Sequence, residues 1–100
     1  MNREEWLREE ARLIILRSLA EETDGTLNSN LLVRILRERY GVKRERPWVH
    51  GELDYLAQMG AISLTDAESV KIAVLIRKGE RHLAREIVIE GVKRPSQPEE

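Results

Sequence analysis

Apolar side chains recur at helical spacing along the first part of the chain. From Asn2 to Glu22 they fall every three or four residues, and the opposite face is rich in Arg and Glu. Asn2 is a suitable N-cap, and Glu5 stands three residues later, as in a capping box. Because Thr23–Gly25 is a turn signal, the pattern predicts one long N-terminal helix that ends before it.

The same spacing predicts two further helices. Asn28 is placed to cap a helix that runs to Tyr40, and Gly41 suits the left-handed position after its end. Pro47 suits the first turn of a third helix, which we expect to run to about Met59. The outer face of this third helix is expected to present Pro47, Gly51, Asp54 and Gln58, flanked by Trp48, His50 and Tyr55.

The hydrophobic period then shortens to two residues, which is typical of strands. Ile62 and Leu64 alternate with hydroxyl residues, and a four-residue polar turn follows over Asp66–Ser69. A second strand alternates an apolar set with a mixed one, namely Val70, Ile72, Val74 and Ile76 with Lys71, Ala73, Leu75 and Arg77. The two strands predict a hairpin, and a last short helix is expected from Gly79 to about Ile87.

A chain of 100 residues has room for one hydrophobic core. The helices and the hairpin are all expected to contribute to it, through Ile14, Ile35, Leu36, Leu53, Leu56 and Ile72.

Three helices, a hairpin and a short fourth helix follow one another in the order of a winged helix. This α+β fold is mostly helical: a three-helix bundle, a two-stranded β-hairpin as the wing, and a short C-terminal helix. We expect the winged-helix domain to span residues 1–91. Residues 92–100 hold two of the three prolines and end in two acids, so we expect a disordered C-terminal tail.

Two short motifs support this fold by resemblance. Residues 53–62, LDYLAQMGAI, resemble the end of a recognition helix entering the wing in ArsR-like and MarR-like regulators, where the pattern is Leu-x-x-Leu-x-x-x-Gly-Leu-Ile. Residues 75–83, LIRKGERHL, resemble the Leu-Thr-x-x-Gly-x-x-x-Leu that leads into the last helix. Ile76 replaces the usual Thr, so the last helix loses its expected cap. The ending over 91–95 is similar to that of small winged-helix proteins of Mu-like phages and prophages.

The resemblance implies a DNA-binding regulator of transcription. The total charge is −1, but six basic and two acidic residues between Arg34 and Arg46 make that segment +4 and leave −5 for the rest. By the resemblance, the basic turn before the third helix would reach phosphates through Lys43, Arg44 and Arg46. Trp48 and His50 would lie near bases or sugars. The wing would reach the flanking backbone or minor groove of double-stranded DNA through Lys71, Arg77 and Lys78.

Two other interpretations of these residues stay open. The basic run is also consistent with a solvated loop whose arginines pair with nearby acids, and Trp48 with packing at the core edge. Glu52 and Asp54 on the third helix favour a winged-helix module for protein interaction or assembly, because acids repel phosphate. The convergence of the basic residues on one side of the molecule would separate the two functions.

Several classes of function have no support in the residues. The chain has no Cys, no Gly-rich phosphate loop and no Ser-His-acid motif, so we expect neither an enzyme nor a cofactor. His50 and His82 are far apart, and His82 with Glu86 supplies too few ligands for zinc, so we expect no metal and a surface position for His82.

The same sequence bears on location and assembly. No apolar run has signal-peptide character or approaches the roughly 20 residues of a membrane span, so we expect a cytoplasmic protein without a membrane partner. Trp6 and the apolar face from Leu7 to Ile15 offer more apolar surface than the core needs, which predicts a homodimer through the N-terminal helix.

Overall fold

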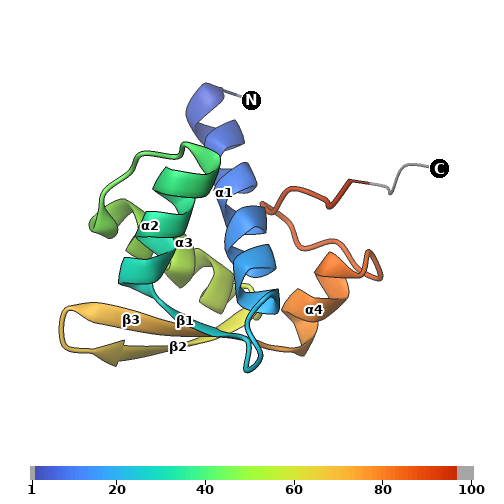
Figure 1. Cartoon of the computed structure of the whole chain (residues 1–100). Coiled ribbons are helices and arrows are strands. Elements are labelled where there is room, and N and C mark those ends of the chain that lie inside the picture. Colours follow the sequence, from blue (N-terminus) through green and yellow to red (C-terminus); the bar gives the residue numbers. More distant parts are fainter. Residues whose placement is uncertain (1, 97–100) are drawn as a thin grey trace.

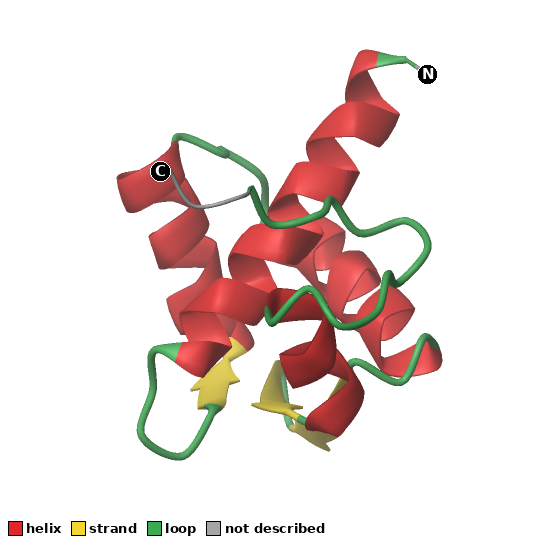
Figure 2. Cartoon of the chain, turned by 90° about the vertical axis from the view of Figure 1, so that its right-hand side faces the viewer, coloured by secondary structure: helices red, strands yellow, loops and turns green. Residues whose placement is uncertain are grey.

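The computed structural model describes residues 2–96 as one mixed α+β unit, as the sequence predicts (Figure 1). The elements follow in the order α1 (Arg3–Ala20), β1 (Thr26–Asn28), α2 (Ser29–Tyr40), α3 (Arg46–Gln58), β2 (Ile62–Ala67), β3 (Val70–Leu75) and α4 (Arg77–Leu83). In Figure 1, α1, α2 and α3 lie on one side of a small sheet, and α4 lies beside α1. The N-terminal end of α1 projects beyond the rest of the chain, as Figure 2 shows.

Local signals set the ends of the first two helices. The Asn2 side chain accepts the Glu5 N–H at 2.8 Å, and the Glu5 carboxylate accepts the Asn2 N–H at 3.4 Å, so the predicted capping box is confirmed. Asn28 accepts the Leu31 N–H at 2.9 Å, and Gly41 has a φ of 70°. Gly41 therefore ends α2 in the left-handed conformation that the sequence predicts.

The sheet has three strands rather than the two predicted. β3 is central, with β1 and β2 antiparallel on its two sides. β1 is only three residues long, which is too short for an alternating pattern to reveal. The hairpin turn is also tighter than the four residues expected: Ala67 pairs with Val70, and Glu68 takes a positive φ of 58°.

The face that β3 turns to the helices is set by its two neighbours. Leu27 of β1 and Leu64 of β2 both lie opposite Ala73, and Ala73 is fully buried. Residues opposite each other share a face, so Ala73 points into the core and Ile72 points away from it. Placing Ile72 in the core was therefore wrong. Both sets of β3 residues contain apolar side chains, so alternation does not decide which set is inside.

The rest of the predicted core is present. Ile14, Leu36, Leu53 and Leu56 are buried, and Ile35 packs against them at the edge. α2 and α3 therefore have the rotational phase that their apolar spacing predicts. α1 is buried on all sides from Leu13 to Leu16, so its burial is wider than the one face predicted.

The chain after α4 folds back along α1 instead of continuing as a helix. α4 ends at Leu83, short of the expected Ile87, and Ile76 at its N-cap gives no side-chain hydrogen bond, as expected. Val92 is buried, and the Lys93 N–H donates to the Glu9 carbonyl at 3.2 Å. The packed chain thus passes the predicted boundary at residue 91. Residues 97–100 of the expected tail lie outside the described residues.

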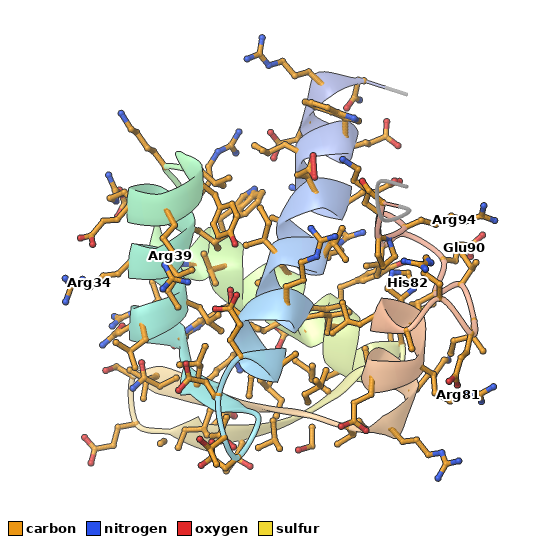
Figure 3. The ribbon with its side chains drawn as sticks, turned by 45° about the vertical axis from the view of Figure 1, so that its right-hand side comes forward. Arg34, Arg39, Arg81, His82, Glu90 and Arg94 are labelled. Atoms are coloured by element: carbon orange, nitrogen blue, oxygen red, sulfur yellow. The ribbon has the colours of Figure 1, made fainter. Side chains whose placement is uncertain are left out.

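His82 holds this returning segment and is not on the surface, contrary to expectation. Its side chain is completely buried. Nδ1 accepts the Ile89 N–H at 3.1 Å, and Nε2 lies 3.0 Å from the Lys93 carbonyl oxygen. Since Nδ1 faces a donor and Nε2 an acceptor, the proton belongs on Nε2. Figure 3 shows His82 turned inward between α4 and this segment.

A second link joins α1, α3 and the C-terminal segment through Arg12. Its Nε donates to the Glu52 carboxylate at 2.6 Å, and Nη1 donates to the Gly91 carbonyl at 2.8 Å. The guanidinium lies 3.8 Å from the centre of the Tyr55 ring. Glu52 is 4% exposed, so it faces the interior and does not add to the outer charge of α3.

Candidate nucleic-acid interface

The predicted contact residues fall into two groups at opposite ends of α3. Lys43, Arg44, Arg46, Trp48, His50 and Lys71 lie near its N-terminal end, and Arg77 and Lys78 lie in the first turn of α4. A Cβ at Gly60, just after α3, would lie 3.5 Å from Lys78 Cδ. The 13 residues of α3 span about 20 Å, so the groups are well separated. Placing Arg77 and Lys78 on the hairpin wing was wrong.

The outer face of α3 is the one that the sequence predicts. Four residues on this face are exposed: Pro47, Gly51, Asp54 and Gln58. The flanking residues Trp48, His50 and Tyr55 are half-buried. Trp48 packs against the core, which agrees with the core-edge interpretation of this residue.

Arg44 and Trp48 both bind the carboxylate of Glu4 on α1. Arg44 donates to the two Glu4 oxygens at 2.8 and 3.1 Å, and the Trp48 indole N–H donates at 2.9 Å. The Arg44 guanidinium also lies 5.0 Å from the Trp48 ring centre. The hydrogen bonds from Arg44, and then from Trp48, hold the pKa of Glu4 below its usual value. The interpretation of paired arginines is confirmed for Arg44.

Arg46 and Lys43 differ from Arg44 because they face solvent. Both side chains are exposed, and Arg46 Nη1 lies 3.4 Å from the Asn30 side-chain oxygen, a neutral partner. Their charges are available at the loop where the chain enters α3.

His50 points toward α2 and the hairpin. Its Nε2 lies 2.9 Å from Ser29 Oγ, which also accepts the Lys71 N–H at 2.9 Å. Burial lowers the pKa of His50, and the nearby cations Lys71 and Arg46 lower it further. His50 is therefore a neutral polar group near this end of α3.

The positive charge of Lys71 is balanced by two nearby acids. Its ammonium lies 2.7 Å from Asp66 and 3.7 Å from Asp54. The hydrogen bond to Asp66 is the main reason that the pKa of Lys71 is raised. Acids thus stand between the basic residues at this end of the molecule, at Glu4, Asp54 and Asp66.

Four further arginines lie away from this region. Figure 3 shows Arg34 and Arg39 projecting from α2, with Arg81 and Arg94 on the opposite side of the molecule. Arg34 pairs with Glu38 at 3.4 Å, and Arg39 pairs with Glu21 at 3.2 Å. At the start of α3, Glu4 pairs with Arg44 and Glu45 lies 3.6 Å from Arg37, whereas Lys43 and Arg46 make no ion pair among residues 2–96.

Among residues 2–96, no group of three or more His, Cys, Asp or Glu side chains is arranged to hold a metal ion. None of the described helices has the length and apolar character needed to cross a membrane.

The chain resembles a phage protein along nearly its whole length. The uncharacterized protein gp26 of Escherichia phage Mu is 30% identical over 89 residues, which cover 89% of this chain and 91% of the phage protein. No family model matches the chain, and no solved structure matches it significantly.

Proposed function

This chain belongs to the family of the phage Mu protein gp26, and we propose from the arrangement of its own elements that it is a small winged-helix protein that binds duplex DNA and regulates transcription. α2 and α3 are joined by a short loop over 41–45, α3 has an exposed outer face, and the β2–β3 hairpin follows as the wing (Figure 1). In this arrangement the N-terminal end of α3 faces the DNA.

One observation carries the DNA proposal. Lys43, Arg44 and Arg46 lie within four residues of one another, in the loop and at the start of α3. Cations at such a position reach backbone phosphates and need no particular base sequence. The outer face beyond them offers few base readers, since Gly51 has no side chain and Asp54 accepts only from cytosine. Binding is therefore expected to be weakly selective and steeply dependent on salt.

The test is a duplex of mixed sequence titrated by fluorescence anisotropy over a salt series. With about three to five phosphates neutralised, the slope of log K against log salt is expected at about −3 to −4.5. Replacing Arg44 and Arg46 by Ala should weaken all duplexes alike and make the slope shallower. Replacing Arg77 and Lys78 by Ala removes the same charge at the other end of α3 and should leave the slope unchanged.

Two results would count against DNA binding as proposed. If the protein does not bind duplex DNA at low salt, the proposed DNA binding is wrong. Tight binding to one sequence that survives loss of Arg44 and Arg46 would show that other residues read bases.

A specific observation favours a second function, protein interaction or assembly. Asp54 is 62% exposed on the outer face of α3, and Asp66 and Glu68 are exposed near the hairpin tip. These acids repel phosphate and suit a basic protein surface. Replacing Asp54 by Asn separates the two functions: it should strengthen duplex binding if DNA docks here and leave binding absent if a protein does.

We also propose that two copies associate through the N-terminal end of α1. Trp6 is 57% exposed on the part of α1 that projects from the body (Figure 2). The apolar face that the sequence offers for this role is smaller than expected, because Leu13, Ile14 and Ile15 are buried in the core. Trp6 and half-buried Leu7 remain for a partner.

A further inference from the structure

The carboxylate of Glu4 lies among a set of N–H donors. Arg44 directs both terminal nitrogens at it, the Trp48 indole adds a third donor, and Arg8 Nε lies 3.4 Å away. These donors come from α1, the α2–α3 loop and α3. The tertiary fold thus assembles a cradle for one anion, formed by Arg44 and Trp48 with Arg8 at its edge.

The cradle has the chemistry of a phosphate site. The planar guanidinium fork binds carboxylates and phosphates in the same two-pronged geometry, and an indole N–H can only donate. Lys43 adds a further cation where the chain leaves α2, lining with Arg3 and Arg44 a hollow of about 460 Å³. Of the anions that could lie here, a phosphate also satisfies this additional positive charge.

Glu4 can leave the cradle without unfolding the protein. The side chains of Glu4 and Arg44 are 40% and 36% exposed, and ion pairs at such positions contribute little to stability. Glu4 lies in the first turn of α1, so rotation about its own side-chain bonds is enough to move the carboxylate away. The backbone of α1 can stay in place.

We propose that Arg44 and Trp48 form a phosphate-binding cradle that Glu4 occupies in the free protein and that a nucleic-acid phosphate takes over by displacing Glu4. This inference rests on the proposed DNA binding. It makes Glu4 an internal competitor, so the free protein binds duplex DNA less tightly than its basic loop allows. As a carboxylate, Glu4 is charged at neutral pH, and its hydrogen bonds with Arg44 and Trp48 lower its pKa further.

The decisive variant is Glu4→Gln, with Glu5→Gln as its matched control. Both remove one negative charge from the same turn of α1, but only Glu4 binds Arg44, and Gln at position 5 can keep the capping box. Glu4→Gln should tighten duplex binding about two- to fivefold, the factor that corresponds to breaking a surface ion pair. Glu5→Gln should change it by far less. Thermal unfolding checks that both variants fold as the unaltered protein does.

A double-mutant cycle locates the effect at Arg44. In an Arg44→Ala background, Glu4→Gln should give a much smaller gain, because the two Arg44 donors are gone and the Trp48 N–H is the main donor left to release. Equal gains from Glu4→Gln and Glu5→Gln, or an undiminished gain without Arg44, would overturn the cradle while leaving DNA binding intact.

Phosphate binding to the cradle can be measured by NMR without any DNA. The chain has two Trp residues, so Trp6→Phe assigns the Trp48 indole N–H signal in an NMR spectrum. Inorganic phosphate should shift this signal at lower concentration in Glu4→Gln than in the unaltered chain. If neither the unaltered chain nor Glu4→Gln binds duplex DNA, but phosphate shifts the Trp48 signal as expected, the proposed DNA binding is wrong and the anion cradle is supported. If neither DNA nor phosphate moves the signal, the cradle fails too.

Discussion

At the scale of single residues, side chains on α3 owe their properties to partners from other elements. His50 meets a buried hydroxyl from α2 and two cations, and Glu52 meets Arg12 of α1. Both residues lie on one helix, yet their surroundings make one of them a neutral donor or acceptor and the other a buried anion. The charge of α3 thus follows from tertiary contacts more than from its own sequence.

The titration of His50 should show its surroundings. Burial and the cations Lys71 and Arg46 lower its pKa, outweighing the opposite effect of Asp54. We expect an NMR midpoint below the usual value of about 6.5. Between the lowered pKa and the unfolded value, the unfolded chain binds more protons than the folded one. The stabilising contribution is therefore complete above about pH 6.5 and is lost as the pH falls through the folded pKa.

The variant His50→Gln is the control for this titration. Its free energy of unfolding should fall less than that of the unaltered protein as the pH is lowered through this window. A midpoint at or above the usual value would mean that the two cations and burial do not act on the imidazole as described.

Loss of Glu52 should lower the stability of the protein far more than loss of an exposed acid on another helix. The Arg12 and Glu52 side chains are only 12% and 5% exposed. Glu52→Ala leaves a buried guanidinium without its anion and should cost about 3–5 kcal/mol in urea unfolding. Glu38→Ala breaks the exposed pair with Arg34 and should cost about 0.5 kcal/mol or less. Similar costs for the two variants would contradict the buried position of Glu52.

At the scale of elements, the helices and strands differ in how strongly their own residues determine them. The buried residues of α2 and α3 follow one apolar stripe on each helix. In α1 the four consecutive residues Leu13 to Leu16 are all buried, so this part of the helix is covered on every side. β3 has apolar residues on both sides, and it takes its orientation from β1 and β2. α2 and α3 therefore show their inner faces in their sequences, whereas the central strand and the second half of α1 do not.

The phase of α3 is open to a direct stability test. Leu56 is completely buried, so Leu56→Ala should lower the free energy of unfolding by about 2–5 kcal/mol. Leu31 on α2 is 44% exposed, and Leu31→Ala should change it by about 0.5 kcal/mol or less. A small effect at Leu56, comparable with that at Leu31, would show that the helix is rotated from the position described.

At the scale of the whole molecule, two features remain on the surface after the core is formed. One is the basic loop at the start of α3, interrupted by acids, and the other is the projecting end of α1 with Trp6. They lie close together, because Trp6 and Lys43 line the same hollow. Association of two copies and binding of DNA are therefore expected to influence each other.

Self-association can be measured by sedimentation velocity over a range of protein concentrations. The unaltered chain is expected to form dimers that Trp6→Ala weakens, because a large exposed ring is the main apolar group at this end. Tyr40→Ala removes another exposed ring, from α2, and should have no effect. A monomer at high concentration in the unaltered chain would exclude this interface.

The sequence alone determined what depends on near neighbours along the chain. Asn2 with Glu5, Asn28 with Leu31, and Gly41 set helix ends through contacts between residues a few positions apart. The spacing of apolar residues fixed the inner faces of α2 and α3, and the order of the elements predicted the mixed α+β class. The residues that form such a signal lie within about one turn of helix, so all of them can be identified from a short stretch of sequence.

Only the tertiary structure decided the features that join distant residues. Arg12 reaches Glu52 across 40 positions and Gly91 across 79, and Arg44 reaches Glu4 across 40. The same holds for the orientation of β3, the burial of His82 and the pairing of Lys71 with Asp54. In each case several partners of suitable charge or polarity exist along the chain, and local sequence gives no preference among them. The choice is made when the helices and the sheet pack, because packing brings one set of side chains within bonding distance and separates the others.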